Sequence, residues 1–101
     1  MNNNMLSFTK KDLTEVDYVW YDKQTAITLT APIEPSRRLF DRYDGNQILH
    51  MINYFAQTIQ QCSMQQANIL EKLLRNELPF GIKSELSVFR WLVERFNDAV
   101  K

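Results

Sequence analysis

Apolar side chains in the second half of the chain recur every three or four positions, which is the spacing of one face of an α-helix. The pattern predicts three helices, over residues 46–62, 64–76 and 84–100, with Asn46, Ser63 and Ser84 as their N-caps. Ser63 and Gln66 also match a capping box, which strengthens the predicted start of the second helix. The apolar stripes are Ile48, Ile52, Phe55, Ile59 and Cys62 in the first helix, Ala67, Leu70 and Leu74 in the second, and Leu86, Phe89, Leu92, Val93, Phe96 and Val100 in the third.

The first third of the chain has the composition of β-strands. The segment VDYVWY (16–21) is rich in β-branched and aromatic residues, and TAITLTA (25–31) alternates apolar and polar positions. The polar DKQ between them suits a hairpin loop, and two prolines end the second strand. Residues 36–44 then read as a short helix, with Gly45 in the position after its end.

Together these elements predict a single α+β domain over residues 1–101. Its N-terminal part, residues 1–34, is β-rich and forms a β-hairpin, with room for a third short strand. Its C-terminal part, residues 35–101, is a bundle of three to four helices. A two-stranded ribbon is marginal by itself, so the hairpin is expected to pack on the helices.

Composition narrows the class of protein. Twelve basic residues balance twelve acidic ones, so neither half is a charged arm for nucleic acid. Cys62 is the only cysteine, which excludes an intrachain disulfide and favours a cytoplasmic location. No segment approaches the ~18 consecutive apolar residues of a membrane span, so no membrane partner is expected.

The residue types that carry catalysis are sparse. His50 and Cys62 are the only residues of their types, and on one straight helix they stand about 18 Å apart along the axis. One histidine and one cysteine are too few ligands for a structural zinc site, and two glycines are too few for a phosphate-binding loop. The sequence therefore predicts a non-enzymatic protein with no catalytic residue, metal, cofactor or small-molecule substrate.

The segment from Gly45 to Leu70 contains no charged residue, although 24% of the chain is charged. One side of the helix 46–62 is apolar and the other is polar without charge. Amides can be buried with hydrogen bonds, whereas buried charges are costly, and interface cores are depleted in charge. We therefore predict that a protein partner covers this polar side, most simply a second copy in a homodimer. The predicted interface residues are His50, Asn53, Tyr54, Gln57 and Gln61. The alternative is that the helix is central and the rest of the chain covers both its sides.

A second hypothesis is a small DNA- or RNA-binding regulator. The segment PSRRLFDRY holds Arg37, Arg38 and Arg42 beside two aromatic residues, a combination that suits phosphates and bases. The helices 64–76 and 84–100 loosely resemble a helix-turn-helix pair, which would add Lys83 and Arg90. The connection between them is longer than the usual ~3–4-residue turn, and ion pairs with nearby acids are the competing interpretation of the arginines.

Overall fold

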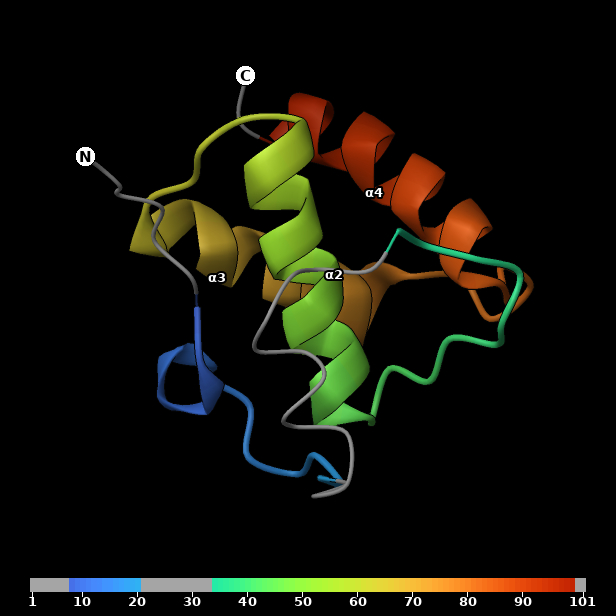
Figure 1. Ribbon diagram of the computed structural model, residues 1–101, viewed down its shortest axis with the longest axis horizontal. Coiled ribbons are helices and arrows are strands. Elements are labelled where there is room, and N and C mark those ends of the chain that lie inside the picture. Colours follow the sequence, from blue (N-terminus) through green and yellow to red (C-terminus); the bar gives the residue numbers. More distant parts are fainter. Residues whose placement is uncertain (1–7, 21–33, 100–101) are drawn as a thin grey trace.

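The computed structural model describes residues 8–20 and 34–99. Within these residues the fold is helical (Figure 1). Its helices are α2 (Gly45–Thr58), α3 (Met64–Lys72) and α4 (Glu85–Ala99), and α3 continues into a π-helical turn, η3 (Leu73–Glu77). A short 3₁₀ turn, η1 (Lys10–Asp12), lies in the first described segment. Residues 8–20, which contain this turn and are otherwise without helix or strand, are called the strap.

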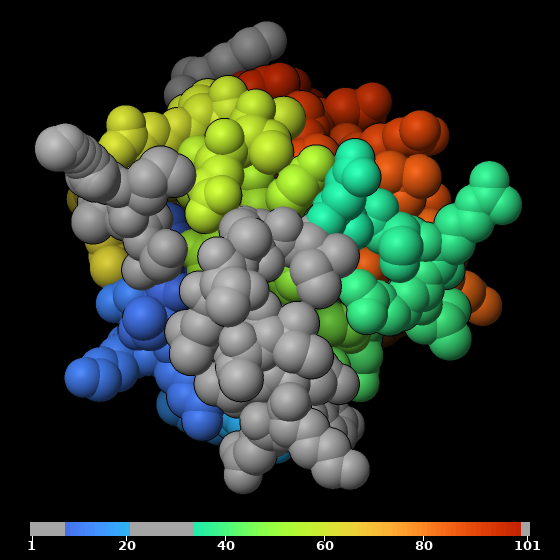
Figure 2. Space-filling view, in the orientation of Figure 1, coloured from blue at the N-terminus to red at the C-terminus, as the bar shows by residue number. Residues whose placement is uncertain are grey.

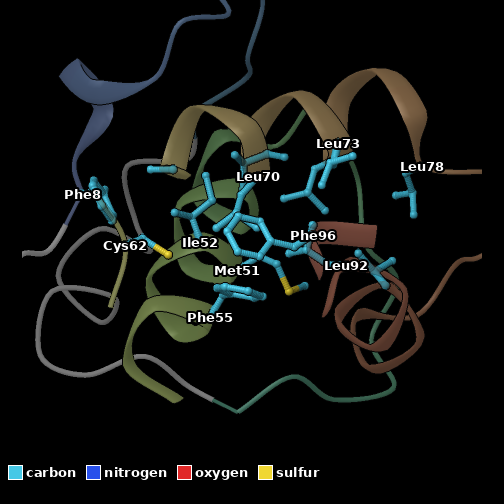
Figure 3. Packing of buried hydrophobic residues seen from close by; sticks show 14 residues of the cluster. Phe8, Met51, Ile52, Phe55, Cys62, Leu70, Leu73, Leu78, Leu92 and Phe96 are labelled. Atoms are coloured by element: carbon cyan, nitrogen blue, oxygen red, sulfur yellow. The ribbon is translucent and has the colours of Figure 1, made fainter. Parts of the chain in front are cut away.

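The core lies where α2, α3 and α4 meet (Figure 3). Ile48, Ile52 and Phe55 of α2 are fully buried, and the Phe55 ring meets the Phe96 ring of α4 edge to face at 5.0 Å. Removing a buried phenylalanine side chain costs about 3–5 kcal/mol, so this contact is a main support of the bundle. The other core residues are Phe8, Met51, Cys62, Ala67, Leu70, Leu73, Leu74, Leu78, Val88 and Leu92.

The three long helices confirm the helical pattern of the sequence, with changes at their ends. The capping box of Ser63 and Gln66 is present, and the Ser84 hydroxyl accepts from the Ser87 amide, as predicted. The N-cap of α2 is Asp44 rather than Asn46, because the Asp44 carboxylate accepts hydrogen bonds from the backbone amides of Asn46 and Gln47. The helix ends at Thr58, before the predicted boundary at Cys62.

The predicted short helix over residues 36–44 is wrong. The segment is irregular, because the carbonyls in its first half bond to the start of α4. The Ser36 and Arg38 carbonyls accept from the first two amides of α4, at 2.9 Å each, and the Phe40 amide donates to the Lys83 carbonyl. A helix over this segment would have used those carbonyls internally, and α4 would have lost its cap.

The predicted N-terminal β-hairpin, and with it the α+β class, is also wrong for the described part of the chain, which contains no strand. Residues 16–20 have no regular secondary structure in the described part of the chain apart from an isolated parallel bridge between Val19 and Asp44, at the start of α2. The other expected strand, 25–31, lies outside the described residues. Strand propensity measures how a side chain fits a half-buried pleated surface, and here the side chain of Val16 is 95% exposed.

The π-helical turn η3 depends on Pro79 and Arg42. Proline has no amide hydrogen, so the Arg75 carbonyl lacks the donor that an α-helix would give it four residues later. The Arg42 guanidinium replaces that donor: it donates to the carbonyls of Arg75 and Leu78. The Leu78 amide bonds to the Leu73 carbonyl, five residues back, which is the π-helical spacing.

Candidate functional site

The uncharged side of α2 is covered in part by the chain itself. The Asn53 side chain pairs with the backbone of Phe8 in the strap, accepting from its amide at 2.8 Å and donating to its carbonyl at 3.1 Å. The Tyr54 ring meets the Phe89 ring of α4 edge to face at 5.1 Å. Contacts within the chain therefore account for two of the five predicted interface residues.

His50 is half-buried and lines a small hollow with Tyr54 and Glu85. The hollow has room for about one water molecule, too little for a substrate. Cys62 is buried in the core, and burial raises the pKa of its thiol, which keeps it in the un-ionised and less nucleophilic form. In residues 8–20 and 34–99, no group of His, Cys, Asp and Glu is arranged to hold a metal ion.

The remaining predicted interface residues, Gln57 and Gln61, are exposed. They belong to a continuous stretch where α2 ends and α3 begins, which we call the uncharged corner (Figure 2, yellow-green to yellow). Ile59 and Met64 within it are 43% and 45% exposed. Its exposed residues are Gln57, Thr58, Ile59, Gln60, Gln61, Ser63, Met64 and Gln65. The corner is thus an accessible surface of amides, hydroxyls and apolar side chains that carries no charge.

The arginine segment is largely occupied by structural contacts. Arg42 caps the end of η3 and lies against the Phe80 ring at 4.5 Å. Arg38 forms an ion pair with the buried Glu85 at 3.2 Å. The other three residues of the nucleic-acid hypothesis, Arg37, Lys83 and Arg90, are exposed, and none of them has an ion-pair partner in the described part of the chain. Two of the three arginines of the predicted patch are therefore committed to the fold.

The start of α4, which would face DNA in a helix-turn-helix pair, has no free donors in its first turn. The amides of Glu85 and Leu86 donate to backbone carbonyls of residues 36–38, and the Ser87 amide donates to the Ser84 hydroxyl. A phosphate at this helix end would have to displace these partners, because anion binding at a helix start depends on unpaired amides. This geometry weighs against a nucleic-acid site there.

A polar cluster between the strap and α3 was missed by sequence reasoning. Glu71 is fully buried, and its carboxylate accepts four hydrogen bonds from the strap. The donors are the Thr14 amide (2.8 Å), the Thr14 hydroxyl (2.9 Å), the Glu15 amide (3.1 Å) and the Tyr18 hydroxyl (2.6 Å). A signal was present in the sequence: Glu71 lies one turn after Ala67 and one turn before Leu74, on the apolar face of its helix.

Arg75 lies one turn after Glu71 and completes the cluster. Its side chain is only 6% exposed and donates to the Asp17 carboxylate at 2.7 Å. The guanidinium lies 4.7 Å from the ring centres of both Tyr18 and Tyr43. Its Nε and Nη1 atoms are buried without an acceptor among the described residues. The cationic group is therefore held by two aromatic rings and one ion pair, an arrangement that binds the strap to the helices.

The cluster shifts the pKa values of its members in different directions. Burial, and next the hydrogen bond to Glu71, raise the pKa of Tyr18, so its hydroxyl remains a donor at neutral pH. The hydrogen bond from Arg75 lowers the pKa of Asp17 below its ordinary value. Burial alone would lower the pKa of Arg75, but the bonds to Asp17 and Tyr18 raise it. At the start of α2, burial raises the pKa of Asp44 in spite of its two amide donors.

Comparison with known proteins identifies no relative. No family model matches the chain, and no curated protein or solved structure is significantly similar to it. None of the described helices combines the length and the apolar character that crossing a membrane requires.

Proposed function

We propose that the chain is a non-enzymatic protein-interaction module that self-associates through the uncharged corner. The observation that carries the proposal is the exposure of eight uncharged residues in a row, interrupted only by the buried Cys62. The side-chain amide of Asn53 and the ring of Tyr54 have partners within the chain. The side chains of Gln57 and Gln61 are exposed to solvent. The predicted interface is therefore narrowed to the uncharged corner, where α2 ends and α3 begins.

The physical argument concerns what this surface gains on burial. A solvated helix end usually carries lysine and glutamate, whose charges are costly to bury. Gln57 and Gln61 can exchange hydrogen bonds across an interface, and Ile59 and Met64 provide apolar area, worth about 25 cal/mol per Å² buried. A two-fold axis through the corner would place each helix end against its counterpart. A small interface of this kind is expected to give a dimer that dissociates on dilution.

The test is the mass measured by light scattering over a dilution series, for the natural chain and for Gln57→Lys and Ile59→Lys. We expect the natural chain to be dimeric at high concentration and both variants to remain monomeric, because each places a charge in the proposed interface. Asn76→Lys is the matched control, since it adds the same charge to an exposed position of η3. A natural chain that stays monomeric at high micromolar concentration would remove the proposal.

The nucleic-acid hypothesis is the alternative, supported by Arg37, Lys83 and Arg90, whose side chains are exposed and have no ion-pair partner among residues 8–20 and 34–99. Nucleic-acid binding would weaken steeply with salt. It would be lost when Arg37, Lys83 and Arg90 are all replaced by alanine. Dimerisation through buried apolar and amide contacts would survive salt. A cytoplasmic location, favoured by the single cysteine, remains part of the proposal.

A further inference from the structure

Two large apolar side chains outside the uncharged corner are open to solvent on irregular segments of the chain. Phe80 is 82% exposed and lies in a turn closed by the hydrogen bond from the Ile82 amide to the Pro79 carbonyl. Leu39 is 72% exposed and lies in the segment before α2. Single exposed apolar residues are common, so such a pair indicates a binding surface only if the fold brings the two together in surroundings that select a partner.

The fold places the segments of Leu39 and Phe80 side by side. An isolated antiparallel bridge joins Leu39 to Ser84, and further along the same two segments the Arg42 guanidinium lies 4.5 Å from the centre of the Phe80 ring. The segments therefore run antiparallel, with Leu39 at one end of the pair and Phe80 at the other. Arg42 is three residues from Leu39, about 10 Å at most along the backbone, so one short peptide can reach both apolar side chains.

The surroundings of these two side chains are basic. Within residues 34–43 and 79–84, four cations stand against two acids, in a chain whose net charge is zero. The cations are Arg37, Arg38, Arg42 and Lys83, and the acids are Glu34 and Asp41. Arg37 and Lys83 are exposed and have no ion-pair partner among the described residues, so they are available to a ligand. We call Leu39, Phe80 and the four cations the basic apolar surface.

We propose that the basic apolar surface binds a short peptide segment of another protein, one that carries acidic and large apolar side chains. The apolar side chains of the peptide cover Leu39 and Phe80, and its carboxylates pair with Arg37 and Lys83. Complementary charge of this kind selects the partner and speeds association. A second copy of the chain does not fit, because a two-fold contact through this surface places like charges against each other. The inference is independent of the self-association proposed above, which uses the uncharged corner.

Nucleic acid and anionic lipid fit this surface less well than an acidic peptide does. One face of the Phe80 ring already carries the Arg42 guanidinium, so that face is not free for base stacking. The aliphatic side chain of Leu39 gains nothing from a phosphate. Insertion of Phe80 into a lipid layer would carry the Arg42 charge with it, which is costly in hydrocarbon. A peptide can cover the ring and leave Arg42 on the carbonyls that it caps.

The test is a fluorescence anisotropy titration of the natural chain against a short fluorescein-labelled peptide that alternates glutamate and leucine. We expect binding that weakens as salt is added, because part of the attraction is between exposed charges. Leu39→Ala and Phe80→Ala should each weaken the binding by about fivefold or more, as expected of an apolar contact at the centre of an interface. Neither side chain belongs to the core, so both variants should keep the circular dichroism of the natural chain.

The charged half of the proposal is tested with Arg37→Glu and Lys83→Glu, which should also weaken the binding and reduce its dependence on salt. Lys11→Glu is the matched control, since it makes the same change of charge at an exposed position of η1, on the other side of the molecule (Figure 1). It should bind the peptide as the natural chain does. A peptide with lysine in place of glutamate, or with alanine in place of leucine, should bind more weakly than the original.

Three results would overturn the proposal: no binding of the glutamate–leucine peptide, binding that Leu39→Ala and Phe80→Ala leave unchanged, or tighter binding of another ligand at the same residues. The other ligands to titrate are a single-stranded oligothymidine and vesicles that contain phosphatidylserine. The corner variants Gln57→Lys and Ile59→Lys should leave peptide binding unchanged. The peptide titration and the measurement of self-association can therefore fail separately.

Discussion

Gly45→Ala is expected to destabilise the natural chain, although the same substitution usually stabilises a helix. Gly45 is the first residue of α2, and no glycine in the described residues has a positive φ, so alanine can adopt the same backbone. A Cβ at this position would lie 2.5 Å from the Trp20 ring. Carbon atoms pack at about 3.5–4.0 Å, so the ring must move by about 1 Å or more.

The sign follows from comparing two magnitudes. Overpacking of a well-packed site costs about 1–3 kcal/mol, and replacing glycine by alanine in a helix gains about 0.5–1 kcal/mol. The clash should win, and Gly45→Ala should lower the free energy of unfolding. In a Trp20→Ala background the clash is absent, so the same substitution should raise it. The two backgrounds should therefore differ in sign, with a coupling energy of about 1–3 kcal/mol.

The measurement is a double-mutant cycle by urea denaturation, followed by circular dichroism at 222 nm because the cycle removes a fluorescent tryptophan. Equal effects of Gly45→Ala in both backgrounds, whatever their sign, would show that Trp20 does not rest on the start of α2. The bridge between Val19 and Asp44 would then also need revision, because it places Trp20 beside Gly45.

Three further outcomes follow from the polar contacts. Arg42→Met should cost about 1–3 kcal/mol in urea denaturation, since two carbonyls at the end of η3 lose their donor, whereas the exposed Arg37→Met should change stability by less than about 0.5 kcal/mol. Tyr18→Phe removes a donor to the buried Glu71 and should cost about 1–3 kcal/mol; an unchanged denaturation midpoint would contradict the contact. The ion pair lowers the pKa of Asp17 below 3.8, so its stabilisation is present above the pKa of the unfolded chain and is lost as the pH falls through the folded one. Asp17→Asn should therefore be less stable than the natural chain at pH 6, and the difference should shrink below about pH 4; a difference independent of pH would contradict the ion pair.

The helices could be predicted from the sequence because their signals are local. The stripe of Ile48, Ile52 and Phe55 and the caps at Ser63 and Ser84 are set within a few residues of one another. The strand and short-helix predictions failed where the backbone bonds to distant segments. Residues 36–40 pair with 83–86, and neither composition nor periodicity reports such a partner.

For the candidate surfaces too, local features could be predicted from the sequence and contacts with distant segments could not. The absence of charge between Gly45 and Leu70 is visible in the sequence, and the corner is the part of it that the fold leaves exposed. The hydrogen bond between the Asn53 side chain and the backbone of Phe8, 45 positions away, could not be predicted from the sequence. The role of Glu71 could have been predicted, because a carboxylate on the apolar face of a predicted helix needs hydrogen-bond donors from elsewhere in the chain.

Charge is distributed unevenly between the buried and the exposed parts of the described chain. Glu71, Arg75 and Glu85 are buried, and each holds a segment of irregular chain rather than a helix. The exposed corner, where water would solvate charges without cost, has none. The ion pairs of Arg75 with Asp17 and of Glu85 with Arg38 each join a buried group to a partner that is more than half exposed, so solvent screens part of their attraction. If the chain self-associates as proposed, covering the uncharged corner would bury apolar and amide groups without removing any charge from water.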